Sequence, residues 1–172
     1  LGHIVGFAEE SFADYRRALR QIAHYDHDLL NAMYVTPHRW SDWSGEHGER
    51  LVVQEDPSKW DYRHQLLGSR HLKPWQIFAL VKWMELRIHL RPKALWRILR
   101  HRDPGMRRYL RWCFIYSARV WLYEVAEFVL HTRTPQQARS LREWFQAKRP
   151  AASAANTVTG QPVAMPVRVQ RG

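Results

Sequence analysis

The first 37 residues, LGHIVGFAEESFADYRRALRQIAHYDHDLLNAMYVTP, predict a strand, a helix and a second strand. Residues 3–5 are a short apolar run that ends at a glycine, and residues 29–35 are a second run that ends at Thr36-Pro37. Two strands flanking a helix make a βαβ unit, which favours a parallel sheet whose strands end at a common edge. Ligands of such α/β folds bind at that edge.

The helix between these strands is expected from Ser11 to about Tyr25. Ser11 followed three positions later by Asp14 is a capping-box pattern, which marks a helix start. Apolar side chains then recur at spacings of three and four residues, at Phe12, Tyr15, Leu19 and Ile22. The pattern predicts an amphipathic helix.

The remainder of the chain changes character near residue 57. Residues 36–56 are a long polar loop that contains a candidate short strand at 51–53. Five helices with proline-marked starts are then expected over about residues 57–68, 74–90, 92–99, 104–131 and 135–148. Residues 149–172 carry neither aromatic nor acidic side chains, so we expect a disordered tail there. The sequence thus divides into 1–56, 57–148 and 149–172.

The amino-acid composition limits the classes of protein to which this chain can belong. The 172 residues include 27 Lys and Arg against 16 Asp and Glu, and the 45% of hydrophobic residues with nine Trp exclude a wholly disordered basic tail. A single cysteine, Cys113, excludes an internal disulfide framework and a self-contained iron–sulfur cluster. Residues 112–130 are the most apolar stretch, but Arg119, Glu124 and Glu127 interrupt it, which argues against a spanning helix. The chain opens at Leu1, and we expect it to be a piece of a longer protein.

Charge is distributed unevenly along the chain. Residues 1–58 carry a net charge of −5, residues 59–131 a net charge of +10 and residues 132–172 a net charge of +6. The arginines of the middle segment are interleaved with Trp83, Trp96 and Trp112. This basic region is compatible with an anionic membrane surface, with nucleic acid, or with an acidic partner domain of the same protein.

The opening strand carries the pattern G-x-I-x-G-x-x-E in Gly2-His3-Ile4-Val5-Gly6-Phe7-Ala8-Glu9. The spacing of this pattern is by itself typical of many buried strands that end in glycine. In context it resembles the fifth-strand motif of radical S-adenosylmethionine (SAM) enzymes, in which the apolar residue packs on the adenine and the glycine lets the backbone approach the ligand. Tyr34-Val35-Thr36-Pro37 resembles the segment that edges the adenine pocket in that family. The resemblance therefore implies that Gly2, Ile4, Gly6, Glu9 and Tyr34, Val35, Thr36 and Pro37 line the SAM edge.

Further segments resemble the C-terminal third of the anaerobic magnesium-protoporphyrin IX monomethyl ester cyclases, a cobalamin-dependent radical SAM family. They are Tyr34-Val-Thr-Pro-His-Arg-Trp40, Lys59-Trp-Asp-Tyr-Arg-His-Gln-Leu66, Arg70-His-Leu-Lys-Pro-Trp75 and Arg91-Pro-Lys-Ala-Leu-Trp-Arg97. The resemblance covers about residues 1–131 and implies the last βαβ edge of a partial TIM barrel, followed by an all-α C-terminal extension. It also implies that the [4Fe-4S] and cobalamin sites lie outside this chain, which holds no cluster motif. We expect the chain alone to be inactive.

The family resemblance implies oxidative closure of the isocyclic ring of a magnesium porphyrin in anaerobic bacteriochlorophyll biosynthesis. Aromatic, Arg and His side chains suit a flat macrocycle with carboxylates and a metal, which makes His38, Arg39 and Trp40 the candidate substrate contacts. The alternative is that His38 and Arg39 only cap the strand end. Expected partners are the porphyrin and the missing N-terminal domains, in the cytoplasm, with peripheral contact to the inner or intracytoplasmic membrane. The non-enzymatic alternative is a basic helical module that binds an anionic membrane surface or, less favoured, nucleic acid.

Overall fold

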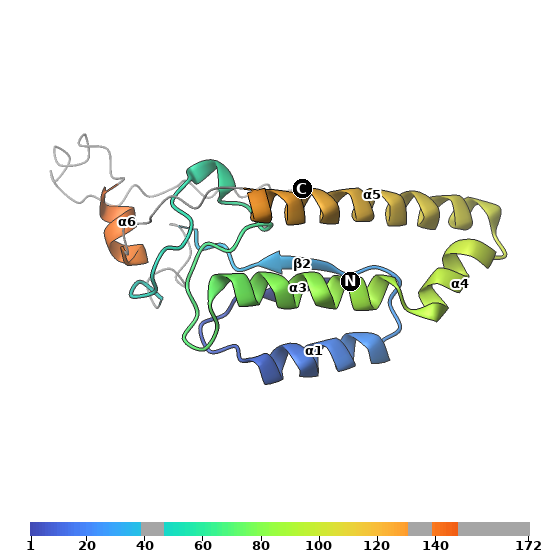
Figure 1. Cartoon of the computed structure of the whole chain (residues 1–172), viewed down its shortest axis with the longest axis horizontal. Helices are drawn as coiled ribbons and strands as arrows, with labels where there is room; N and C mark the ends of the chain where they lie inside the picture. Colours follow the sequence, from blue (N-terminus) through green and yellow to red (C-terminus); the bar gives the residue numbers. More distant parts are fainter. Residues whose placement is uncertain (39–46, 131–138, 148–172) are drawn as a thin grey trace, which may run out of the picture.

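The computed structural model describes residues 1–38, 47–130 and 139–147. It is mostly helical, with a small two-stranded sheet (Figure 1). In chain order the elements are β1 (Gly2–Val5), α1 (Phe12–His24), β2 (Asn31–Tyr34), the 3-10 helix η1 (Pro57–Lys59), α3 (Pro74–His89), α4 (Pro92–Arg100), α5 (Pro104–Leu130) and α6 (Leu141–Ala147).

The predicted βαβ unit is confirmed. Strands β1 and β2 pair in parallel, with Gly2 opposite Asn31 and Val5 opposite Tyr34. The start of α1 is also as predicted, since the backbone N–H and the hydroxyl of Ser11 both donate to Asp14, at 3.0 and 2.6 Å.

Helices cover one face of this sheet. Val5 and Tyr34 are buried in a core with side chains of α1 and α3, namely Tyr15, Ile22, Ile77, Val81, Met84 and Ile88. Side chains alternate between the faces of a strand, so Gly2 and Ile4 project to the opposite face. Ile4 is 51% exposed there. Among the described residues, the sheet thus has one packed face and one open apolar face.

The long helix α5 runs above β2 and α3 in Figure 1. It contacts α3 through the stacked rings of Phe78 and Phe128, whose centroids are 3.9 Å apart, and through Trp121, whose indole N–H donates to the Lys82 carbonyl at 3.2 Å. Only Leu110 and Cys113 of α5 are buried. Most of α5 therefore faces away from the core.

A second, smaller core joins α6 to the loops before α3. Its buried members are Val52, Leu66, Leu67, Leu141 and Trp144. Trp60 stacks on Trp144 with ring centroids 3.9 Å apart. This stack joins residues far apart in the sequence.

The prediction of a helix over residues 57–68 is wrong beyond its first turn, η1. Two interactions hold the backbone out of a helix. The Asp61 carboxylate accepts from the backbone N–H groups of Arg63 and His64, and the Tyr62 carbonyl accepts from Tyr34 N–H at 2.7 Å. The segment therefore lies along the edge of β2 that β1 leaves free.

Other expectations need smaller corrections. Residues 51–53 make isolated bridges, from Leu51 to Ser140 and from Val52 to Leu67, rather than a strand. Phe12, on the predicted apolar face of α1, is 53% exposed. Helix α6 matches the later part of the helix expected over 135–148. The predicted tail over 149–172 lies outside the described residues.

Candidate functional site

The carboxyl ends of β1 and β2 bring together two of the segments predicted from sequence. The Val35 N–H donates to the Val5 carbonyl at 2.9 Å, which places Gly6 beside Tyr34 and Val35. Gly6 has φ of +90°, a backbone conformation that side-chain-bearing residues rarely adopt. A glycine is thus required where β1 turns away from the sheet.

The backbone of Gly6 is held on both sides by charged side chains. Its N–H donates to the Glu10 carboxylate at 2.8 Å, and its carbonyl accepts from the Arg50 guanidinium at 2.8 Å. Arg50 also donates to the Gly68 carbonyl, at 2.6 and 3.0 Å. The Tyr15 hydroxyl donates to the same Glu10 oxygen at 2.7 Å. The end of β1 is thereby fixed to α1 and to the loops around residues 50 and 68.

Burial shifts the pKa values of Arg50 and Tyr15 without changing their charges near neutral pH. Burial lowers the pKa of Arg50 to about 10, against the opposing effect of Glu10 and Glu9. Burial also raises the pKa of Tyr15, and the nearby Glu10 carboxylate adds to the shift. Arg50 thus stays cationic, and Tyr15 keeps the proton that it donates to Glu10.

Glu9, the acidic residue of the predicted motif, lies on the surface. Its carboxylate is 3.0 Å from Arg70 and 3.8 Å from His71. The Arg70 backbone N–H and the Ser69 hydroxyl both donate to the Ala8 carbonyl, at 2.9 and 3.1 Å. Residues 69–71 therefore lie against the turn between β1 and α1.

The side chain of Tyr34 packs among the helices. It is 4% exposed, and its hydroxyl is buried without a hydrogen-bond partner among the described residues. Burial, together with Glu85 and Glu124, raises the pKa of Tyr34. At the strand edge Tyr34 therefore presents its backbone rather than its ring.

The residues after Tyr34 contact the irregular segment 60–64. The Thr36 hydroxyl lies 3.1 Å from the Asp61 carbonyl, to which it donates, and Pro37 is buried. The His38 ring lies edge-on to Tyr62, with 3.4 Å between His38 Nε2 and the Tyr62 hydroxyl. Arg39 and Trp40 lie outside the described residues.

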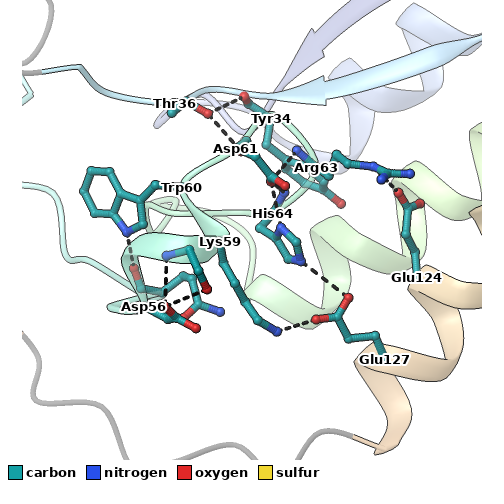
Figure 2. Close-up of polar contacts among 12 residues, drawn as sticks. Tyr34, Thr36, Asp56, Lys59, Trp60, Asp61, Arg63, His64, Glu124 and Glu127 are labelled. Atoms are coloured by element: carbon teal, nitrogen blue, oxygen red, sulfur yellow. Dashed lines mark hydrogen bonds and ion pairs between the residues drawn. The ribbon is translucent and has the colours of Figure 1, made fainter.

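Figure 2 shows how segment 59–64 is anchored to the carboxyl-terminal turns of α5. Lys59 pairs with Glu127, and Arg63 pairs with Glu124 at 3.1 Å. His64 lies between two carboxylates, 2.7 Å from Asp61 and 3.5 Å from Glu127. The hydrogen bond from Lys59 lowers the pKa of Glu127. These contacts fix Asp61 and Tyr62 beside the end of β2.

A second ionic group is buried between α3 and α5. The Lys82 ammonium lies 2.7 Å from Glu85 and 2.5 Å from Glu124. Burial raises the pKa of Glu85, whereas Lys82 and a hydrogen bond from the Ala32 backbone oppose that rise. Glu85 therefore links α3 to β2 as well as to Lys82.

Sequence reasoning missed the groups that hold the site. Glu10 directly follows the predicted Glu9, and only the three-dimensional turn decides which carboxylate reaches Gly6. Arg50 comes from a polar loop with no local motif. No group of three or more His, Cys, Asp or Glu in the described ranges could hold a metal ion, and Cys113 is buried in α5.

The comparisons with known proteins agree with the resemblance found in the sequence. The chain is 39% identical over 142 residues to the anaerobic magnesium-protoporphyrin IX monomethyl ester cyclase of Synechocystis sp.. The match covers 83% of this chain and 28% of that relative, a share that fits the predicted correspondence to its C-terminal part. Neither a family model nor a solved structure matches. The predicted resemblance is confirmed, and the chain spans about a quarter of the length of the relative.

Proposed function

We propose that this chain is part of a cobalamin-dependent radical SAM cyclase. The complete enzyme would close the isocyclic ring of magnesium-protoporphyrin IX monomethyl ester in anaerobic bacteriochlorophyll biosynthesis, an oxidation in which water supplies the oxo oxygen. The similarity to the Synechocystis cyclase over 142 residues carries this proposal. The parallel β1–β2 pair supports it, because it suits the last βαβ edge of a partial barrel.

The open face of the sheet is the proposed contact for SAM. Ile4 is about half exposed on that face, next to the small residue Gly2 and one residue before β1 ends. An exposed aliphatic side chain flanked by glycines can lie flat against an apolar ring such as adenine. Glu10 and Arg50 would fix the Gly6 backbone beside the ligand rather than touch it.

The chain's own residues do not suit an iron–sulfur cluster. The sequence has one cysteine, which is buried in α5. A [4Fe-4S] cluster needs several thiolates, so other domains of the longer protein would hold it. The family resemblance implies that cobalamin is also held outside this chain, and the two groups supply the radical chemistry when bound.

The porphyrin is the proposed neighbour of His38, Arg39 and Trp40. His38 and Tyr62 lie together beyond the end of β2, and Tyr62 is 54% exposed. A planar aromatic side chain and an imidazole suit the face and the metal or carboxylate groups of a macrocycle. The anchoring of segment 59–64 on α5 would hold Tyr62 in place for this contact. The proposed location is the cytoplasm.

The function is tested with the longer protein that carries this chain, purified without oxygen and supplied with cluster, cobalamin and SAM. We expect conversion of magnesium-protoporphyrin IX monomethyl ester to its ring-closed product, with oxygen from isotopically labelled water in the new oxo group. Replacing Tyr62 with Ala should raise the KM for the porphyrin while SAM affinity stays constant. Loaded protein that neither cleaves SAM nor converts the porphyrin would refute the proposal.

A further inference from the structure

The side of α5 that faces away from α3 is broad and apolar. Its most exposed large side chains are Trp112, Ile115, Leu122, Tyr123, Val129 and Leu130, each at least 61% exposed. Trp112 and Tyr116 stack on one another with ring centroids 5.4 Å apart. We call this side the outward face of α5. An exposed face of this length that is rich in large apolar side chains calls for a partner.

The charges on the outward face are all of one sign. Arg108, Arg111 and Arg119 are exposed on α5, whereas none of its exposed residues is acidic. The two glutamates of α5 are occupied elsewhere, since Glu124 pairs with Lys82 and Arg63, and Glu127 pairs with Lys59. Arg111 also reaches the carbonyls of Ile98 and Leu99, which ties the end of α4 to this face. The partner should therefore be apolar and anionic.

We propose that the outward face of α5 lies flat on an anionic lipid surface. The helix has 27 residues and is about 40 Å long, with basic groups as far along as Arg119 and aliphatic and aromatic groups along its length. Trp and Tyr place their rings at the level of lipid headgroups, and arginines pair with the phosphates. No described helix is long and apolar enough to cross a bilayer, so contact would be along the surface.

Charge placement favours lipid over nucleic acid as the occupant. The part of the face beyond Arg119 carries no basic group, and Leu122, Val129 and Leu130 are exposed there. A nucleic-acid strand along the helix would leave its phosphates unpaired over those aliphatic side chains. A lipid surface can contact both parts of the face, because its phosphates pair with the arginines and the aliphatic side chains beyond Arg119 enter the acyl region. This inference does not depend on the proposed reaction.

The test is flotation of the longer protein that carries this chain with vesicles of phosphatidylcholine plus phosphatidylglycerol, and with vesicles of phosphatidylcholine alone. We expect binding to the anionic vesicles and markedly weaker binding to the neutral ones. The variant Arg108→Glu/Arg119→Glu should bind about tenfold more weakly or worse, since each basic group near the surface contributes to binding. Its matched control, Arg16→Glu/Arg20→Glu, changes the charge equally on exposed positions of α1 and should bind like the unaltered chain.

A second pair of variants tests the apolar part. Tyr116→Ser/Tyr123→Ser should also lose binding, while Phe12→Ser/Tyr25→Ser, which removes two exposed rings of similar size near α1, should not. All four substituted positions are exposed, and circular dichroism confirms that the variants fold. No binding to anionic vesicles, or equal losses in the α1 controls, overturns the proposal. A self-associating chain that Tyr116→Ser/Tyr123→Ser makes monomeric, without vesicle binding, would assign the face to a second copy instead.

Discussion

The Glu10 carboxylate joins the backbone N–H of Gly6 to the hydroxyl of Tyr15, at 2.8 and 2.7 Å through one oxygen. Gly6 ends the first strand and Tyr15 lies in the buried face of α1. The same glycine accepts from Arg50, so the turn at the strand end is fixed by side chains from two directions. Such pre-arranged backbone suits an edge that contacts a ligand.

Replacing Glu10 with Ala should lower the free energy of unfolding by about 2 kcal/mol, because two part-buried donors lose their acceptor. Glu9→Ala removes an exposed carboxylate one position earlier and should cost no more than about 0.5 kcal/mol. Chemical denaturation of the two variants measures the difference. Equal losses would show that Glu10 does not hold the turn.

Replacing Gly6 with Ala should cost about 1–2 kcal/mol through backbone strain at φ of +90°. The added methyl group would meet only ordinary contacts, the nearest at 3.7 Å to the Tyr34 ring, so crowding contributes little. Gly68→Ala is the matched control, because its nearest contact is a similar 3.6 Å without a positive φ. A Gly6→Ala variant as stable as Gly68→Ala would contradict the strain argument.

Replacing Lys82 with Met should destabilise the fold by about 3 kcal/mol at neutral pH, because it strands the buried carboxylate of Glu85. Burial already raises the pKa of Glu85 above its value in the unfolded chain. A group with a raised folded pKa contributes its full stability below the unfolded pKa and loses it as pH rises through the folded pKa.

The loss in free energy of unfolding caused by Lys82→Met should therefore shrink when the pH is lowered towards the pKa of Glu85 in the unfolded chain. Unfolding curves recorded across that range test this, and Lys82→Met/Glu85→Gln should recover at least half of the loss at neutral pH. A deficit that does not vary with pH would mean that lost packing, rather than the stranded charge, causes it.

Lys59 and Glu127 should show an interaction energy of about 1 kcal/mol in a double-mutant cycle of Lys59→Met and Glu127→Gln. Lys59 lowers the pKa of Glu127, so this contribution is present above the unfolded pKa of Glu127 and is lost as pH falls through its folded pKa. We also expect the amides of residues 59–64 to lose protection at acidic pH, measured as exchange rates divided by the intrinsic rate at each pH. Additive single variants would show that segment 59–64 is held by other contacts.

The sequence was sufficient for the parts of the fold that rest on local signals. The capping pattern at Ser11 and the apolar runs around it predicted α1 and both strands, and the prolines at positions 74, 92 and 104 marked three helix starts. The prediction of a helix over 57–68 is wrong because the Asp61 carboxylate accepts from nearby backbone N–H groups and the Tyr62 carbonyl pairs with Tyr34. The pairing with Tyr34 joins residues far apart in the sequence, which produces no periodic pattern. The contacts of Arg50 with Gly6 and of Lys82 with Glu124 were missed because the partners lie far apart along the chain.

The central claim is that the open face of β1 contacts SAM, and the most direct measurement is the SAM affinity of the longer, anaerobically purified protein with Ile4→Asp. Leu90→Asp is the control, because Leu90 is similarly exposed, at 47% against 51%, but follows the last turn of α3. Losing the apolar contact and placing a carboxylate there should weaken SAM binding about tenfold or more, while Leu90→Asp binds normally. Unchanged SAM affinity in a folded Ile4→Asp variant would contradict the account.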